Sequence, residues 1–225
     1  MGLTEDTFAF LRLLAENNNR DWFATHKEDY EIQVRSPAFS LIEHIAPQLA
    51  QISPHFVAKA SKMGGSLMRV HRDVRFSKNK QPYKTHIGIQ FRHEQGKDIH
   101  TPGFYVHIEA NNVFLGVGIW HPDAVALKGI RQHIDTFSTT WTEALAGEAF
   151  RKHFSLTGDS LKRAPKGYPI SHPMIEDLKR KDFIAIAPIA PELCFEADFA
   201  DIVSDYFKLG VPLMQELCRA VRIPF

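Results

Sequence analysis

The chain of 225 residues is 44% hydrophobic and 24% charged, which is typical of folded globular proteins and excludes the disordered and fibrous classes. Its 27 basic and 26 acidic side chains give a net charge of +1, so no molecule-wide field attracts nucleic acid or membranes. The sequence contains no internal repeat and no linker rich in Pro, Gly or Ser. We therefore predict a single domain over residues 1–225.

The cysteines and the N-terminus indicate the compartment. Cys194 and Cys218 are too few for a disulfide framework, so we expect both to be buried and reduced. Glu5 and Asp6 stand where a signal peptide requires basic residues, and no apolar run approaches the ~18 residues of a membrane span. We expect a cytoplasmic protein that makes no contact with membranes.

The N-terminal third has the periodicity of helices. Thr4 is a predicted N-cap for a helix that ends at residues 17–19, and Asn19 is a predicted cap for a short second helix. Ser36 followed by Pro37 predicts the start of a third helix. Pro47 should kink or end this helix, because proline lacks the backbone N–H that a helix interior requires.

From about residue 66 the hydrophobic period changes to two, which is typical of strands. Apolar side chains alternate with polar ones or glycine over 87–92 and 104–109, and an apolar stretch follows over 113–119. Asn111 and Asn112 suit a hairpin turn, because asparagine tolerates positive φ. Since no helix separates these segments, we predict a central antiparallel sheet over about residues 66–120.

Helical periodicity returns after Pro122 and continues to the end of the chain. The predicted helices cover 124–133, 137–145, 173–179 and 199–222, and residues 183–189 are predicted as one further strand. The expected fold class is α+β, with the N-terminal helices and a helical C-terminal half packed on one face of the sheet.

One segment, residues 69–84, concentrates positive charge. It contains six Lys or Arg and one acid, a formal charge of +5, so the rest of the chain sums to −4. Such clustering is costly unless an opposite charge neutralises it, and arginine binds phosphate or carboxylate through two parallel hydrogen bonds. We name residues 69–84 the basic segment and predict that it binds an anion.

The strand period predicts how these side chains point. A strand over 68–76 would place Arg69, His71, Asp73 and Arg75 on one face, and would pack Met68, Val70, Val74 and Phe76 on the other. The next strands would add Lys84, His86, Gln90, Tyr105, His107, Glu109 and Trp120 to the polar face, with Gly88, Gly116 and Gly118 leaving room for a ligand.

The predicted anion-binding residues are Arg69, Arg72, Arg75, Lys80, Tyr83 and Lys84, joined by Lys166 from a turn at residues 161–168. The alternative interpretation is a solvated basic face whose arginines pair with acids, and Asp73 is the nearest such acid.

Three segments resemble a known family: Asn17–Phe23, Arg72–Lys84 and Leu161–Tyr168. They are similar to the uncharacterised bacterial family called domain of unknown function 2461, and the similarity extends over nearly the whole chain. The resemblance implies one conserved domain of bacterial type. It implies no activity, cofactor or site residue.

The histidines offer candidates for proton transfer. His86 and His107 are the candidate acid–base groups, with Glu109 beside them, because the ordinary imidazole pKa lies near neutrality. A metal could be held by His107 and Glu109 with His86 and His121, but their spacing matches no zinc signature, and we predict none. No motif indicates a particular reaction or cofactor.

Three functions are consistent with the sequence. The preferred one is binding of, or action on, a small anionic and phosphate-bearing ligand at the basic segment. The second is binding of single-stranded nucleic acid by the same segment, with Tyr83, Phe76 and Trp120 available for stacking. The third is a non-enzymatic scaffold whose basic segment contacts an acidic protein.

Overall fold

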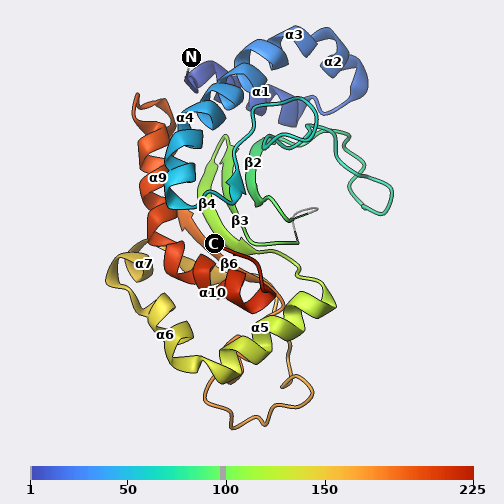
Figure 1. Cartoon of the computed structure of the whole chain (residues 1–225). Helices are drawn as coiled ribbons and strands as arrows, with labels where there is room; N and C mark the ends of the chain where they lie inside the picture. The colour runs from blue at the N-terminus through green and yellow to red at the C-terminus, as the bar shows by residue number, and fades with distance from the viewer. Residues whose placement is uncertain (1, 97–99) are drawn as a thin grey trace.

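The computed structural model of the protein describes residues 2–96 and 100–225. Within these residues six strands form one antiparallel sheet in the order β1-β2-β3-β4-β6-β5 (Figure 1). The strands are β1 (Phe56–Val57), β2 (His86–His93), β3 (Gly103–Glu109), β4 (Asn112–Ile119), β5 (Ser155–Thr157) and β6 (Phe183–Pro188). This sheet and its helices confirm the predicted α+β class, but the sheet extends beyond residues 66–120 at both ends.

Two of the N-terminal helices, α1 (Glu5–Glu16) and α2 (Arg20–Thr25), begin after the residues that were predicted to cap them. These helices are followed by α3 (Lys27–Tyr30), a π-helical turn (Glu31–Arg35) and α4 (Ser36–Ile52). Thr4 is the N-cap of α1, as predicted. The Asn19 side chain accepts the Trp22 N–H at 2.9 Å and so caps α2, which confirms the second predicted cap.

The prediction that Ser36 caps α4 is wrong, and of the two outcomes predicted for Pro47, a kink or a helix end, the helix end does not occur. Ser36 does not cap the helix, because it has helical angles and follows the π-helical turn without a break. Pro47 does not end the helix, which continues to Ile52. An interior proline costs about 3 kcal/mol, but each fully buried aliphatic side chain contributes about 1.5–3 kcal/mol. α4 buries three of them completely on either side of the proline: Ile42, Ile45 and Leu49.

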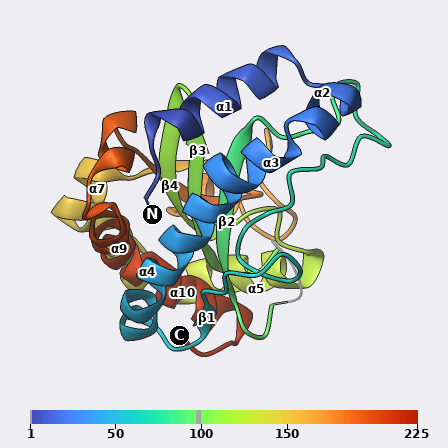
Figure 2. The ribbon, with the colours of Figure 1, turned by 90° about the horizontal axis from the view of Figure 1, so that it is seen from above.

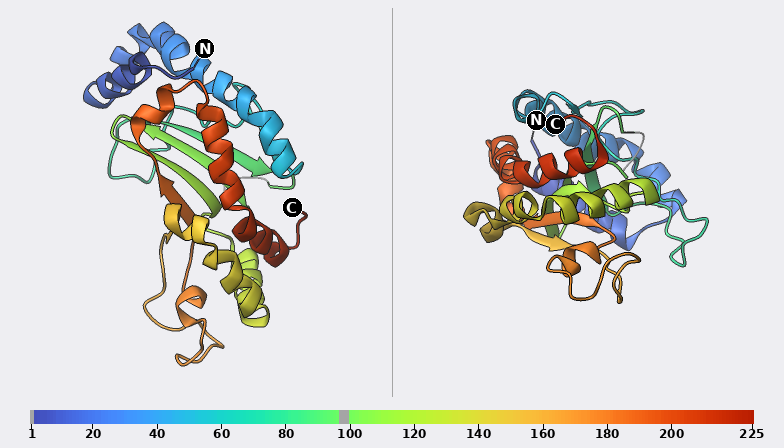
Figure 3. Two further views of the ribbon diagram at one scale, coloured as in Figure 1. Left: turned by 90° about the vertical axis from the view of Figure 1, so that its left-hand side faces the viewer. Right: turned by 60° about the horizontal axis from the view of Figure 1, so that its bottom comes forward.

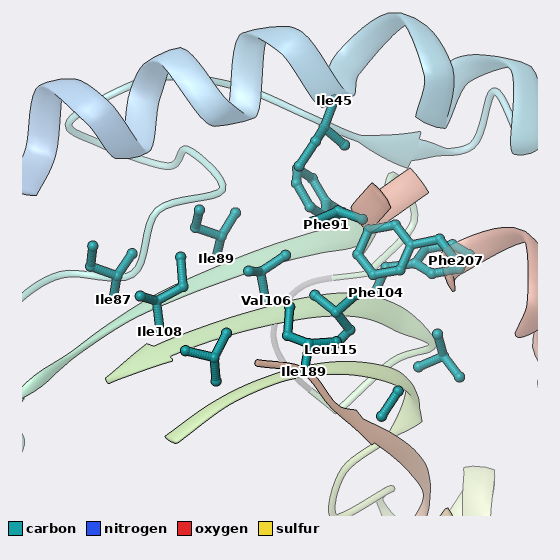
Figure 4. Packing of buried hydrophobic residues seen from close by; sticks show 14 of the residues in the cluster. Ile45, Ile87, Ile89, Phe91, Phe104, Val106, Ile108, Leu115, Ile189 and Phe207 are labelled. Atoms are coloured by element: carbon teal, nitrogen blue, oxygen red, sulfur yellow. The ribbon is translucent and has the colours of Figure 1, made fainter. Parts of the chain in front are cut away.

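The helices cover one face of the sheet. α4 and α9 lie side by side on that face, and the chain between β1 and β2 lies on the other side (Figures 1 and 2). Turned through a right angle, the molecule shows α4 and α9 in front of the strands (Figure 3). Alternate strand residues point into this layer, among them Ile87, Ile89, Phe91, Phe104, Val106 and Ile108 (Figure 4).

The C-terminal part contains more breaks than its periodicity predicts. Its helices are α5 (Ala124–Thr136), α6 (Ser138–Ala146), α7 (Glu148–His153), α8 (Ile175–Leu178), a 3-10 turn (Pro191–Phe195), α9 (Phe199–Leu209) and α10 (Val211–Val221). The single helix predicted over 199–222 is divided at Gly210. A side chain at Gly210 would meet Val117 of β4, with its Cβ at 2.8 Å from Cγ1. The predicted strand at 183–189 is confirmed as β6, whereas α7 and β5 were not predicted.

Cys194 and Cys218 are free and buried, as expected. No helix formed by residues 2–96 or 100–225 is both long and apolar enough to cross a membrane.

Candidate functional site

The sheet face opposite the helices carries the polar residues of β2 and β3, as the strand period predicts. The ladder places His86 opposite Glu109, Gly88 opposite His107, and Gln90 opposite Tyr105. The rings of His86 and His107 are 4.4 Å apart. Two adjacent strands therefore bring a group of titratable side chains together on one open face.

The basic segment is not the regular strand predicted over 68–76. Among the described residues its one β-bridge, His71 with Tyr83, pairs two residues of the segment with each other, and the bridge to β2 is made by the preceding Leu67 with Ile89. The Asp73 side chain accepts the backbone N–H of Arg75 at 3.2 Å, and such a local turn competes with ladder hydrogen bonds. Phe76 was predicted to pack, but 95% of its surface is exposed.

A cavity of about 470 Å³ lies over the open face. Its wall is mainly apolar, with polar groups from Lys84, Gln90 and Tyr105. The apolar part of the wall comes from β4 and the residue after it, from β6 and from the chain before β2, chiefly from Met68, Phe114, Trp120, Ile184 and Ile186. Cavities of this size and composition are typical of small-molecule sites.

Gly116 also lines the cavity. A Cβ on Gly116 would make only ordinary contacts, the nearest being Tyr105 Cβ at 3.5 Å, so a side chain fits at this position without a clash. The prediction of space above Gly88 is wrong, because a Cβ there would meet Tyr105 Oη at 2.8 Å and Met68 Sδ at 3.1 Å. Gly118 lines the cavity, but its φ of +130° is a backbone requirement.

Lys84 joins the cavity to the basic segment. Its half-buried side chain lines the cavity, and Nζ donates to the Arg69 carbonyl oxygen at 2.9 Å. Burial and then the positive charge of Arg69 lower the pKa of Lys84. Lys84, Arg69 and Arg72 form no ion pair with any described residue, since no carboxylate oxygen lies within 4.0 Å of their charged atoms. Lys84 at the cavity rim and the neighbouring Arg69 and Arg72 therefore form no salt bridge with the described chain, although the charge of Arg69 also acts on Asp73.

The other predicted anion-binding residues do not join these three. Arg75 is paired with Asp73 at 2.7 Å, and hydrogen bonds from Arg75 lower the pKa of Asp73 to about 2. Lys80 is exposed and donates to the Val74 carbonyl oxygen at 3.0 Å. Tyr83 is buried and its ring stacks on Phe23 at 4.1 Å.

Lys166 also lies apart. It is exposed on the loop between β5 and α8, which is drawn in orange at the opposite end of the molecule from the basic segment (Figure 1). The same loop is attached to α5, where His172 and Asp135 are paired at 3.0 Å. The ammonium of Lys166 therefore does not reach the cations at the cavity rim.

The three candidate catalytic residues are neighbours on the open face. Tyr105 Oη and His107 Nδ1 are hydrogen bonded at 3.1 Å, and His107 Nε2 lies 3.7 Å from a carboxylate oxygen of Glu109. Thr85 donates to the second oxygen of Glu109 at 2.8 Å. His107 Nε2 is buried and has no hydrogen-bond partner among the described residues.

Burial sets the protonation of this group. It lowers the pKa of His86 to about 4, with further lowering from His107 and from the cations Lys84 and Arg72. Burial also lowers the pKa of His107 and raises that of Tyr105 to about 12. Both imidazoles are therefore neutral at pH 7, and the phenol keeps its proton.

The metal ligands considered from the sequence are dispersed. His121 is paired with the buried Asp182 at 2.8 Å instead of joining His86 and His107. Within residues 2–96 and 100–225, no group of three or more His, Cys, Asp or Glu could hold a metal ion.

The apolar wall is the part of the site that sequence reasoning missed. Alternation within β6 does place Ile184 and Ile186 on the face opposite the buried Phe183, Ala185 and Ala187. That signal becomes useful only when β6 is known to lie beside β4, because the cavity wall is formed by both strands.

A comparison with known protein families matches residues 6–215 to the family described as Conserved hypothetical protein (DUF2461). No curated protein matches the chain. The matched range contains the whole basic segment and every residue of the cavity wall. The resemblance drawn from the three sequence segments is thus confirmed.

Proposed function

Since the chain belongs to the DUF2461 family of conserved hypothetical proteins, whose description names no activity, we propose from the geometry of the open face that it binds a small organic anion. The anionic group of the ligand lies at the rim with Lys84, Arg69 and Arg72. An apolar or aromatic body of the ligand fills the cavity.

The position of Lys84 carries this proposal. Its half-buried ammonium is at the boundary between an apolar cavity and two further cations, and no described carboxylate neutralises it. A partly desolvated cation gains more from an ionic partner than an exposed one, and a phosphate or carboxylate accepts several hydrogen bonds from such a cluster. The apolar wall favours a ligand whose anionic group is attached to a hydrophobic body over a free inorganic ion.

Calorimetry with three probes tests the two halves of the proposed ligand. The probes are naphthalene-2-sulfonate, inorganic sulfate, and naphthalene-2-methanol, which represent the whole ligand, its head and its body. We expect the naphthalenesulfonate to bind at least about tenfold more tightly than either partial probe, because burial of the ring adds to the ionic contact. Equal affinity for sulfate, or no binding of the naphthalenesulfonate, contradicts the proposal.

Matched variants locate the binding. Lys84→Met keeps the aliphatic stem and removes the charge, and should weaken naphthalenesulfonate binding about tenfold or more. Lys80→Met is its control, because Lys80 is exposed and contacts a carbonyl of its own loop. Gly116→Val should fill the cavity, whereas Gly147→Val changes an exposed turn where only Phe150 Cβ, at 3.8 Å, lies within 4 Å. Equal losses from Lys84→Met and Lys80→Met place the binding elsewhere on the basic segment.

One observation favours a second candidate function, the binding of single-stranded nucleic acid. The tip of the basic segment projects from the sheet (Figure 1), and it presents Phe76 at 95% exposure beside the exposed Arg75 and Lys78. Exposed aromatic rings among cations suit stacking of bases and neutralisation of phosphates. This candidate predicts that Phe76→Ala and Lys80→Met weaken oligonucleotide binding in a filter assay, with an affinity that falls steeply as salt rises. No retention of a single-stranded oligonucleotide at low salt excludes it.

A further inference from the structure

His86 lies beside the proposed position of the anionic group. It is the first residue of β2 and lies two residues after Lys84, whose side chain lines the cavity. Lys84 and Arg72 are near enough for their charges to act on the imidazole. From β3, the ring of His107 packs against His86 at 4.4 Å, and Glu109 is opposite it in the ladder. His86 therefore belongs to the cluster of Arg69, Arg72 and Lys84.

The imidazole of His86 has unused hydrogen-bonding capacity. Neither ring nitrogen forms a hydrogen bond with another described residue, whereas Nδ1 of His107 is hydrogen bonded to Tyr105. In the free protein, burial, His107 and the nearby cations outweigh the attraction of Glu109 and leave His86 neutral at pH 7. A neutral imidazole offers one N–H donor, and its protonated form offers two donors and a positive charge.

We propose that His86 is a ligand-binding residue, and that the anion binds together with one proton, which His86 takes up. The inference rests on the proposed function and extends it, because it names a further residue of the site. The negative charge of the ligand offsets the repulsion from Lys84 and Arg72, and the imidazolium then donates a hydrogen bond to the anionic group. The proton comes from solvent and becomes the second N–H of the ring.

The neighbours of His86 do not provide this proton uptake in its place. Arg69 and Arg72 carry guanidinium groups, which have donors only and no site for a further proton. The Nδ1 atom of His107 is hydrogen bonded to Tyr105. Its Nε2 atom is buried and lies 3.7 Å from a carboxylate oxygen of Glu109. His86 is the half-buried imidazole that faces the cations, so the charge of a bound ligand acts on it first.

The pH dependence of naphthalene-2-sulfonate binding tests the inference, because this probe keeps its charge between pH 5.5 and 8.0. The free pKa of His86 is about 4 and the ordinary value is 6.5. A bound anion that restores the ordinary value makes the affinity at pH 5.5 about tenfold higher than at pH 8.0. Binding strengthens as pH falls, because only the bound state takes up the proton in this range.

Two variants and an NMR spectrum test whether His86 is the residue that takes up the proton. His86→Asn should reduce the affinity ratio between pH 5.5 and pH 8.0 to about one, whereas His44→Asn, on the exposed side of α4, should retain the tenfold ratio. In the NMR spectrum of isotopically labelled protein at pH 6, the signals of the His86 ring should change from those of a neutral imidazole to those of a protonated one when naphthalene-2-sulfonate saturates the site.

The outcomes distinguish failure of the proposed proton uptake by His86 from failure of the proposed anion binding. Binding without pH dependence, with His86 neutral in the saturated protein, overturns the inference and leaves the proposed function intact. A tenfold ratio that persists in His86→Asn also overturns it, since another group then takes up the proton. Absence of binding by the naphthalenesulfonate at every pH overturns both.

Discussion

The Asn18 side chain forms hydrogen bonds with both the backbone N–H and the backbone carbonyl oxygen of Tyr83. Its side-chain oxygen accepts the Tyr83 N–H at 3.0 Å, and its side-chain nitrogen donates to the Tyr83 carbonyl oxygen at 3.0 Å. The ring of Tyr83 stacks on Phe23 at 4.1 Å. The Asn17–Phe23 segment at the start of α2 thus anchors the end of the basic segment that leads into β2, although the two are far apart in sequence.

Loss of this anchor should loosen the basic segment. Asn18→Ala removes two half-buried hydrogen bonds, each worth about 0.5–1.5 kcal/mol, so we expect the free energy of unfolding to fall by about 2 kcal/mol. Urea denaturation measures the change, and hydrogen exchange at Tyr83 and Lys84 should accelerate. Asn17→Ala is the control, since among the described residues the Asn17 side chain donates only to the Leu13 carbonyl oxygen of the adjoining helix α1. An equal effect of both substitutions contradicts the assigned role of Asn18.

Substitution by alanine should change the stability of the protein much more at Gly118 than at Gly116, although both glycines lie in β4. Gly118 has a φ of +130°, and a Cβ there would be 2.0 Å from the Phe183 carbonyl oxygen, so Gly118→Ala should cost about 3 kcal/mol or more. Gly116→Ala makes only ordinary contacts and should change the free energy of unfolding by less than about 1 kcal/mol. Urea titrations of the two variants compare them directly. Equal stabilities would mean that β4 adapts at Gly118.

The buried Glu216 should make the protein sensitive to acid. Burial alone would raise its pKa, but hydrogen bonds from His133 and Thr140 and the charge of Arg219 outweigh it and hold the pKa below its ordinary value. A carboxyl whose folded pKa is depressed stabilises the fold above its unfolded pKa, and this contribution is lost as pH falls through the folded pKa. Urea denaturation between pH 7 and pH 3 should show the loss, and Glu216→Gln should be less stable at pH 7 with a smaller dependence on acid. An unchanged slope in that variant assigns the acid sensitivity to other carboxyls.

Both cysteines should be inert in the folded protein. Burial raises the pKa of Cys194 to about 12, and burial raises that of Cys218 to about 12 as well. Because the thiolate is the reactive form, a thiol reagent at pH 8 should label neither residue in native buffer and both in urea. Rapid labelling of one thiol in native buffer contradicts the packing around it.

Local sequence signals predicted those elements whose stability is local. Thr4 and Asn19 cap the helices that they were expected to cap, and the period of two over 87–92 and 104–109 assigns each side chain to its face. Such signals failed where tertiary packing decides the outcome. α4 continues through Pro47 because its buried aliphatic residues outweigh the cost of the proline.

The candidate site was predictable only in its polar half. His86, His107 and Lys84 follow from alternation along a single strand or hairpin. The apolar wall depends on β6 lying next to β4, a pairing between residues nearly 70 positions apart that no local pattern specifies. Arg75 and Lys80 were included because they share the charge of the segment, but the turn at Asp73 directs Arg75 toward its own acid.

The sheet offers almost nothing to an incoming strand. Its two edges are β1 and β5, which have 2 and 3 residues, and residues 66–68 cover the middle of β2, where the Met68 N–H donates to the Gly88 carbonyl oxygen at 2.8 Å. Long unpaired edges promote aggregation by edge-to-edge association, and short or covered edges oppose it. The short and covered edges of this sheet therefore disfavour extension of the ladder by another polypeptide and favour recognition through side chains.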